Sequence, residues 1–511
     1  MIVAFRTDAS LEIGTGHVMR CLTLAKALRA QGAACQFITR ALPGHLGGRI
    51  AQDGFDVALL PAPEGPLPEG PPAHASWAGV DWQRDASDTR AALADRPDWL
   101  VLDHYAFDAR WQRAVLPEGT KLMVIDDLAD RPHVCDLLLD QNLGHKDSDY
   151  AAQIPAGSQC LTGPQFALLR PEFANLRVQA LVGRAGRGLR HLLITMGGVD
   201  RGDATSRVLG ALRGAVLPEG LQITVVMGSN APALEQVHAL AAKMPWPTDV
   251  VVDVKNMAAR MAAADLAIGA AGATTWERCA LGLPSIVVQI ADNQAGIVQA
   301  LHAAGAALDP GPVRASDFSE RLHTNLREAQ DSLDAIAQRA AAICDGDGVG
   351  RVLARIGPFQ PSFRLATSSD SRRIWEWRAA SGLERFSQSR QTPDFMAHHK
   401  WFTAALSDPQ RIFRILMLGG LPCGYLRLDL TGAAHARVSI CLAPDVRGQK
   451  LSAELLAEAA RLGPSLGVLH LDAEIHPENT ASLRCFEQAG YRQRGATGSF
   501  RSYHLGLSEI R

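Results

Sequence analysis

Short hydrophobic runs alternate with helical patterns over the first 140 residues. Between the runs, apolar residues recur at helical spacing, as at Val18, Cys21, Leu22 and Ala25. This alternation of strand and helix predicts parallel βαβ units. The predicted buried strands are Met1–Phe5, Ala34–Ile38, Val57–Leu60, Trp99–Asp103, Lys121–Ile125 and Leu137–Asp140.

A second series of the same kind begins at residue 191. Each apolar run in it is followed by a turn and a helical pattern, so we predict a second doubly wound unit. Residues 318–355 are predicted to form an Ala-rich helix. The predicted strands of this series are His191–Met196, Gln222–Met227, Val250–Val252, Leu266–Gly269 and Ser285–Gln289.

The pattern breaks near Gly357-Pro358, and a different module of about 150 residues follows, a common domain size. With a linker at 356–362, the sequence predicts three domains at 1–170, 171–357 and 362–511. A chain of 511 residues agrees with about three domains as a length prior. The fold class is α/β, with two Rossmann-like halves followed by an α+β domain.

Composition narrows the class of protein. Apolar residues make up 47% and charged residues 20%, which is typical of globular proteins and excludes disordered and fibrous ones. The formal net charge is −2, so no global field attracts nucleic acid or an anionic membrane, and neither is expected as a partner.

The nine cysteines are scattered and never spaced as CxxC, which indicates neither a disulfide framework nor a zinc ribbon. No stretch of signal-peptide or membrane-spanning character is found, so we expect a cytoplasmic protein with reduced thiols. No metal site is expected.

The clearest candidate for catalysis lies near the N-terminus. Arg6-Thr7-Asp8 ends the first strand, Gly14-Thr15-Gly16 makes a tight turn, and His17 begins a helix. The positive end of the helix dipole disfavours imidazolium, so a neutral His17 would accept a proton near pH 7. A histidine here can also simply cap or pack the turn, and GxGH lacks the last glycine of the dinucleotide fingerprint.

Several blocks in order give a more specific signal. FRTDASLEIGTGHVMRCLTLAKAL at the N-terminus, VIDDLADRPHVCDLLLDQN (124–142), GPQFALLRPEF (163–173), ITMGGVD (194–200) and NMAARMAAADLAIGAAGATTWERCALGLPSIVV (256–288) resemble the UDP-sugar hydrolases of pseudaminic acid biosynthesis. That family has the two-domain GT-B fold and is similar to the lipid II glycosyltransferase of peptidoglycan synthesis. The resemblance covers about residues 1–350.

The resemblance implies hydrolysis of UDP-2,4-diacetamido-2,4,6-trideoxy-β-L-altropyranose to UDP and free sugar, with His17 as the base. A neutral base need only deprotonate one water, because UDP leaves as a stable anion. Gly16 and Asp8 are candidate substrate contacts beside His17. Asp103, His104 and Tyr105 end strands at the same edge and are possible sugar contacts or ordinary polar loop residues.

The second half carries two glycine turns after predicted strands. Backbone N–H groups at Gly197 and Gly198, and at Gly272 before a helix, can approach a pyrophosphate closely. The resemblance implies that Glu277 binds the ribose hydroxyls, although a glutamate there can also simply complement the helix dipole. Other candidate substrate contacts in this half are Thr274, Thr275, Asn256, Asn293 and Gln294.

The C-terminal module resembles the GNAT N-acyltransferases. A buried-type strand, Val438–Leu442, is followed by a turn into an amphipathic helix, and His476-Pro-Glu-Asn479 follows a later strand. The resemblance implies that the turn binds the pyrophosphate of acetyl-CoA, the expected co-substrate. The candidate acetyl-CoA contacts are Leu442, Arg447, Gly448, Lys450, Leu451, Ser452 and Asn479.

Two departures from the GNAT pattern bear on activity. Lys450 replaces a glycine and tolerates positive φ poorly, and Phe486 stands where many relatives have the tyrosine that protonates the departing thiolate. That role would pass to Tyr491, Tyr503, water or no side chain. Glu474 and His476 are candidate acceptors of the amine proton, or polar residues at a strand end.

Together the modules predict a bifunctional enzyme of pseudaminic acid biosynthesis. The C-terminal domain would acetylate the 4-amine of a UDP-4-amino-sugar, and the GT-B module would then release UDP from the product. The alternatives are a GT-B glycosyltransferase, or a nucleotide-sugar binding protein with an unrelated or inactive GNAT domain.

Overall fold

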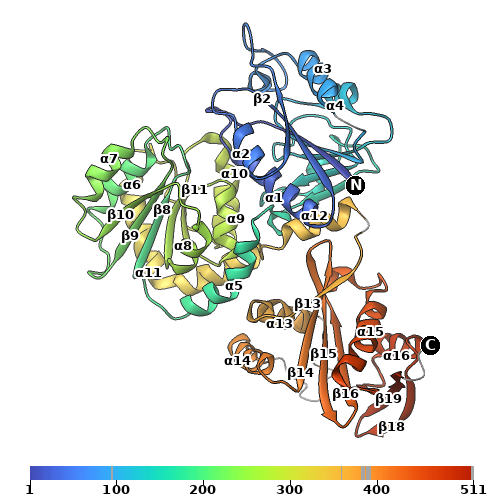
Figure 1. The fold of residues 1–511 in the computed structure, drawn as a ribbon. Helices are drawn as coiled ribbons and strands as arrows, with labels where there is room; N and C mark the ends of the chain where they lie inside the picture. The colour runs from blue at the N-terminus through green and yellow to red at the C-terminus, as the bar shows by residue number, and fades with distance from the viewer. Residues whose placement is uncertain (94–95, 358, 381, 383–385, 387–392, 508–511) are drawn as a thin grey trace. The chain divides into compact units, whose positions relative to one another are not determined.

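The computed structural model describes residues 1–511 with the exception of 94–95, 358, 381, 383–385, 387–392 and 508–511. The side chain of Asn293 is also not described. The described chain forms two compact units, Met1–Ile356 and Gly357–Arg511 (Figure 1). The α/β fold class with parallel sheets is confirmed.

The first unit begins with a seven-stranded sheet in the order β3-β2-β1-β4-β5-β6-β7, in which all neighbouring strands run parallel. The six predicted strands are present, and β7 adds a seventh that the hydrophobic pattern did not indicate. The strands are β1 (Ile2–Thr7), β2 (Ala34–Arg40), β3 (Asp56–Leu60), β4 (Trp99–Asp103), β5 (Lys121–Ile125), β6 (Leu137–Asp140) and β7 (Gln159–Thr162). The helices of this part are α1 (Gly16–Ala30), α2 (Gly47–Gln52), α3 (Trp82–Ala92) and α4 (Ala109–Val115).

A second parallel sheet follows in the same unit, with the order β10-β9-β8-β11-β12. Its strands are β8 (His191–Thr195), β9 (Gln222–Met227), β10 (Thr248–Val252), β11 (Leu266–Ala270) and β12 (Ser285–Val288). The helices are α5 (Pro171–Arg184), α6 (Ala204–Leu212), α7 (Leu234–Ala241), α8 (Met257–Ala263), α9 (Ala273–Ala280), α10 (Ala295–Ala303), α11 (Phe318–Ile343) and α12 (Gly348–Ile356).

The predicted single helix over 318–355 is two helices, α11 and α12. Gly346 between them has φ +85, a conformation that favours glycine. A Cβ at Gly348 would lie 2.3 Å from the Ala167 carbonyl oxygen, so only glycine allows this close approach. The helix α12 then packs against α1, and the Trp99 indole N–H donates to the Ile356 carbonyl at 2.8 Å.

The second unit is built on a mixed sheet in the order β13-β14-β15-β16-β17-β19-β18. Among the described strands of this unit, only β16 and β17 pair in parallel, over His435–Arg437 and His470–Asp472. In Figure 1, α13 and α14 lie on one side of this sheet and α15 and α16 on the other. The elements are β13 (Ser362–Leu365), β14 (Arg411–Leu418), β15 (Leu421–Gly432), β16 (His435–Leu442), β17 (His470–Ile475), β18 (Arg492–Thr497), β19 (Phe500–Gly506), α13 (Ser371–Ala380), α14 (Phe395–Leu406), α15 (Leu451–Leu462) and α16 (Thr480–Gln488).

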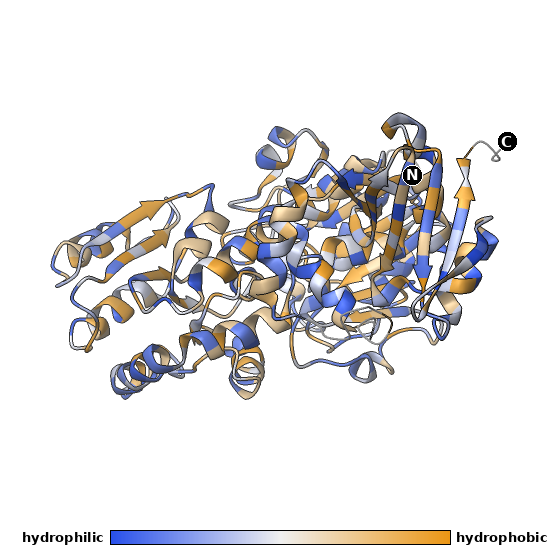
Figure 2. Ribbon diagram, turned by 90° about the horizontal axis from the view of Figure 1, so that it is seen from below, coloured by the Kyte–Doolittle hydropathy of each residue, from blue (hydrophilic) through white to orange (hydrophobic). Residues whose placement is uncertain are grey.

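Burial follows the hydrophobic pattern. The strands of the parallel sheets are mainly hydrophobic, whereas many helices alternate hydrophobic and hydrophilic residues (Figure 2). The two units have separate hydrophobic cores. All nine cysteines are free thiols. Among the described helices, none combines the length and the hydropathy needed to cross a bilayer.

Candidate active sites

His17 lies in a buried ion-pair network at the carboxyl edge of the first sheet. It occupies the first turn of α1, is 8% exposed, and donates from Nδ1 to Oδ1 of Asp103 at 2.6 Å. Arg20, one turn further along α1, donates to both oxygens of the same carboxylate, at 2.6 Å from Nε and 2.7 Å from Nη2. Asp103 ends β4, so the neighbouring strands β1 and β4 bring the three side chains together.

This network fixes the state of Asp103. Burial favours the neutral acid, but Arg20 and His17 outweigh burial and hold the pKa of Asp103 well below its usual range. An ionised Asp103 accepts the Nδ1–H of His17, which leaves Nε2 as the ring nitrogen that can accept a proton. The sequence indicated the helix dipole as the control on His17, whereas the structure adds a carboxylate partner that orients the imidazole ring.

Aromatic rings surround the His17 imidazole. The Tyr105 ring lies edge-on to it, with centroids 4.8 Å apart, and its hydroxyl donates to Asp127. Asn142 donates to the other oxygen of Asp127 at 3.1 Å. These contacts hold Tyr105 beside the histidine, so the predicted strand-end residue belongs to this site.

Asp8, predicted as a substrate contact, is instead an internal residue. Its side chain is 0% exposed and pairs with Arg6 at 2.7 Å. It also accepts from the Thr39 hydroxyl and the Arg40 backbone N–H, while His104 Nε2 lies 3.2 Å away. Asp8 is thus enclosed by protein groups at the strand end, and its contact with substrate stays a prediction.

Gly16 and the two other glycine turns present open backbone. A Cβ built at Gly16, Gly197, Gly198 or Gly272 would meet no atom within 4 Å, so a ligand can approach these residues. Gly197 has φ +96, which favours glycine. Gly228, which no sequence pattern indicated, donates its N–H to the Gly198 carbonyl at 2.9 Å. A Cβ built at Gly228 would lie 2.3 Å from that oxygen.

The helix α9 begins directly after Gly272, as predicted for an anion-binding turn. The Thr275 hydroxyl is buried and accepts from the Gly272 N–H at 3.2 Å and from Arg278 at 3.1 Å. Thr275 therefore caps the helix, and its contact with a phosphate stays a prediction. Thr274 beside it is half-buried.

Glu277 lies in the second turn of α9 with its side chain 15% exposed, and its Oε1 is 3.5 Å from Nη2 of Arg170. Burial raises the pKa of Glu277 to about 7, although Arg170 and Arg278 oppose the shift. The carboxyl group is thus balanced between its neutral and ionised forms near neutral pH.

The remaining candidates of this half are peripheral. Asn256 is exposed just before α8, and its side-chain oxygen accepts from Arg260 at 3.1 Å. Gln294 accepts from the Ile290 backbone N–H at 3.0 Å. The side chain of Asn293 lies outside the described residues.

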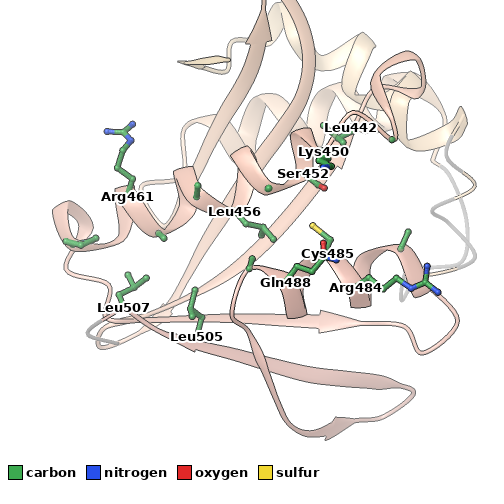
Figure 3. Close-up of a pocket in the computed structure, with 17 residues that line it drawn as sticks. Leu442, Lys450, Ser452, Leu456, Arg461, Arg484, Cys485, Gln488, Leu505 and Leu507 are labelled. Carbon is green, nitrogen blue, oxygen red and sulfur yellow. The ribbon is translucent and has the colours of Figure 1, made fainter. Parts of the chain in front are cut away.

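The second unit contains a cavity of about 1000 Å³ between α15 and α16. Figure 3 shows Leu456, Cys485 and Gln488 gathered between these helices, with Lys450 and Ser452 near the start of α15. Of the predicted acetyl-CoA contacts, Leu442, Gly448, Lys450 and Ser452 line this cavity, whereas Leu451 is buried beside it.

The turn before α15 has the geometry that binds anions. Gly448 has φ +80 and Lys450 φ +61, so Lys450 adopts the left-handed conformation that the sequence analysis expected a lysine to tolerate poorly. Consecutive N–H groups of such a turn, at the start of a helix, form a concave site for a phosphate. The lysine has therefore not removed the turn.

A smaller cavity of about 390 Å³ lies where β16 and β17 separate. Arg447 and Asn479 line it, and Leu442, Gly448, Ser452 and Cys485 line both cavities. Asn479 also caps α16, because its Oδ1 accepts from the Ser482 N–H at 3.2 Å.

The candidate proton-transfer groups Tyr491 and Glu474 line neither of these cavities. Tyr491 is 2% exposed, lines neither cavity, and burial raises the pKa of its phenol above the usual range. Tyr503 donates to Glu487 at 2.8 Å. Glu474 is half-buried on β17, 3.7 Å from Arg437, and also lines neither cavity. The roles of Tyr491 and Glu474 in proton transfer therefore stay predictions.

Within the described residues, no group of three or more His, Cys, Asp or Glu side chains is arranged to hold a metal ion.

Comparisons with known proteins match the two units to different families. Residues 196–345 match the glycosyltransferase family 28 C-terminal domain, and residues 362–492 match the acetyltransferase (GNAT) domain. MurG of Acinetobacter baumannii has a similar fold, with a TM-score of 0.51 and 18% identity over 70% of this chain and 98% of MurG.

Two relatives cover different extents of the chain. The UDP-2,4-diacetamido-2,4,6-trideoxy-β-L-altropyranose hydrolase of Campylobacter jejuni is 26% identical over 51% of this chain and 81% of its own length. An uncharacterized protein of Methanocaldococcus jannaschii is 20% identical over 96% of this chain and 97% of its own length. The chain is thus a GT-B module similar to the UDP-diacetamido-sugar hydrolases, fused to a C-terminal GNAT acetyltransferase domain.

Proposed function

We propose that the GT-B module hydrolyses UDP-2,4-diacetamido-2,4,6-trideoxy-β-L-altropyranose, or a close epimer, to UDP and free sugar. The observation that carries the proposal is the Asp103–His17 hydrogen bond at 2.6 Å. Because this bond engages Nδ1, Nε2 is the nitrogen of His17 that acts as the base. Similarity to the Campylobacter jejuni hydrolase supplies the substrate class.

In this mechanism, water is the nucleophile. His17 Nε2 takes one proton from water as its oxygen bonds to the anomeric carbon, and the bond from that carbon to the β-phosphate oxygen breaks. UDP keeps the electron pair and leaves as an anion. Asp103 stabilises the imidazolium that forms, and Arg20 keeps Asp103 from taking the proton itself.

The nucleotide is proposed to bind to the second sheet of this unit. The diphosphate would be held by backbone N–H groups at Gly197, Gly198 and Gly272, where the chain is open to a ligand. Glu277 would accept hydrogen bonds from the ribose hydroxyls. We assign the catalytic and nucleotide-binding halves to 1–170 and 171–357.

Binding of UDP is expected to strengthen with pH if ionised Glu277 accepts the ribose hydroxyls. With the pKa near 7, the ionised fraction, and with it the affinity, should rise about tenfold from pH 6 to pH 8. Calorimetric titration of wild type and Glu277→Gln at each pH tests this, because the ratio of their affinities cancels the ionisation of UDP itself. A pH-independent ratio would remove Glu277 from nucleotide binding.

We propose that residues 362–511 transfer an acetyl group from acetyl-CoA to the 4-amine of the UDP-4-amino-sugar precursor. The 1000 Å³ cavity and the left-handed turn at Lys450 support acetyl-CoA binding there. The amine attacks the thioester carbonyl carbon, the amide bond forms as the carbon–sulfur bond breaks, and coenzyme A leaves as thiolate. The proton that the amine nitrogen loses passes through solvent to the thiolate. The tether between the modules raises the local concentration of the shared intermediate.

Incubation with the UDP-4-amino-4,6-dideoxy sugar, with and without acetyl-CoA, tests both activities. Mass spectrometry and NMR should show UDP and free diacetamido sugar only when acetyl-CoA is present. Accumulation of intact acetylated UDP-sugar would retain the acetyltransferase and reject the hydrolase. An unchanged substrate would reject acetyl transfer to this sugar, and hydrolysis would then be tested on the acetylated UDP-sugar supplied directly.

A second candidate, transfer of the sugar to an acceptor, is favoured by the match to glycosyltransferase family 28 and by the MurG-like fold. Release of free sugar without any acceptor distinguishes hydrolysis from transfer. A nucleotide-sugar binding protein with an inactive acetyltransferase would instead bind both ligands without turnover.

A further inference from the structure

Aromatic side chains meet at the His17 site from two separate parts of the first unit. His74 and Trp77 lie at 74–77, directly after the Pro- and Gly-rich loop, and Tyr105 follows β4. The Trp77 and Tyr105 rings stack with centroids 5.5 Å apart and an interplanar angle of 27°. The His74 ring packs on both, at 4.7 Å from Trp77 and 5.4 Å from Tyr105. We call His74, Trp77 and Tyr105 the aromatic wall.

The wall is directed at the catalytic imidazole. Both Tyr105 and Trp77 meet the His17 ring edge-on, with centroids 4.8 and 6.4 Å away. A substrate whose anomeric carbon lies within reach of a water on His17 therefore has its sugar ring close to these rings.

Two features distinguish the wall from ordinary core packing. His74 and Trp77 are only half-buried, unlike the fully buried Trp111 on α4. In addition, Nδ1 of His74 is buried yet has no hydrogen-bond partner among the described residues, and such atoms are rare in a packed core. A ligand hydroxyl or amide group would satisfy it.

The chemistry of the wall fits an apolar, deoxygenated sugar. Burial lowers the pKa of His74, which favours the neutral form of the ring. Aromatic faces bury methyl and C–H groups well, and one polar atom among them orients a ligand. A 6-methyl group and N-acetyl methyl groups match such a surface better than a fully hydroxylated hexose.

We propose that the aromatic wall is the sugar subsite of the GT-B module, with Trp77 as the residue that selects 6-deoxy, N-acetylated sugars. This inference rests on the proposed function for the presence of a UDP-sugar at His17. UDP alone would not reach the wall, because the nucleotide is assigned to the second sheet.

The test separates sugar binding from catalysis. In a His17→Ala background, which prevents turnover, calorimetry gives the affinities of the UDP-diacetamido-trideoxy sugar and of UDP. We expect Trp77→Ala to weaken binding of the UDP-sugar about tenfold and to leave binding of UDP unchanged, with Trp77→Phe close to the parent. Trp82→Phe, which replaces a half-buried tryptophan on α3, is the matched control.

Equal loss of UDP and UDP-sugar affinity in Trp77→Ala would indicate damage to the fold and overturn the proposal, as would an unchanged UDP-sugar affinity. The affinity for UDP-glucose is measured in parallel to test selectivity. Trp77→Ala should lower the ratio of the affinity for the UDP-deoxy sugar to the affinity for UDP-glucose. If the wild type binds the UDP-sugar through Trp77 but releases no free sugar, the hydrolase assignment fails while the subsite stands.

Discussion

Replacement of His17 by alanine is expected to lower the rate of sugar release by about 10²–10⁴, the usual contribution of a general base. Nε2 of His17 is the proton acceptor that the Asp103 contact defines, and alanine removes it. Release of UDP from the acetylated UDP-sugar, followed by coupled assay or NMR, measures the effect. Binding of UDP and acetyl transfer should be unchanged, because neither uses the His17 side chain.

Asp103→Asn provides a second variant at the same site. An amide cannot accept the Nδ1–H and stabilise imidazolium as a carboxylate does, so the rate should fall even though the shape is kept. The Arg20 guanidinium would lose its ion pair, so thermal unfolding is measured alongside. Normal sugar release by His17→Ala would remove His17 from the mechanism, whatever Asp103→Asn does.

The fold was largely predictable because the parallel sheets are built from continuous apolar strands. The exceptions have local causes. The strand β7 is only Gln159–Thr162, too short and polar at both ends to give a hydrophobic signal. The break between α11 and α12 depends on the contact of Gly348 with Ala167, which lies far away in the sequence.

The candidate site was predictable where one chain segment carries the signal, and not where distant segments meet. His17 and Gly16 stand in one turn, so the turn pattern indicated them. The pairing of Asp103 with His17 depends on the β1–β4 register, in which Thr7 lies opposite Asp103, and no local pattern reveals it. For the same reason the sequence predicted Asp8 as a ligand contact and did not reveal its protein partners. Its carboxylate pairs with Arg6 and accepts hydrogen bonds from the β2 residues Thr39 and Arg40.

In the second unit, sequence comparison indicated the turn but not its conformation. Lys450 was expected to disturb a loop that prefers glycine, yet it adopts φ +61. The strain of a left-handed lysine is about 1–3 kcal/mol, and it persists where the surrounding structure fixes the backbone. The position of Tyr491 away from both cavities could not be read from its spacing to Phe486, because burial depends on how α16 packs.

Ser452→Glu is expected to raise the KM for acetyl-CoA by about tenfold to a hundredfold, corresponding to a few kcal/mol of charge repulsion near the protein surface. Ser452 lies in the first turn of α15 and lines both cavities, where the phosphates are proposed to bind. A glutamate there complements the helix dipole, so the fold should not weaken. Steady-state kinetics of acetyl transfer at varied acetyl-CoA concentration measures the effect.

Ser452→Gln is the matched control, because it adds nearly the same volume without charge. If charge at the phosphate site is decisive, Ser452→Gln should change the KM for acetyl-CoA much less than Ser452→Glu, and raised salt should reduce the difference between them. Hydrolysis of the already acetylated UDP-sugar should be the same in both variants. Equal effects of the two substitutions would mean that volume matters and charge does not, so the pyrophosphate would not bind at the start of α15.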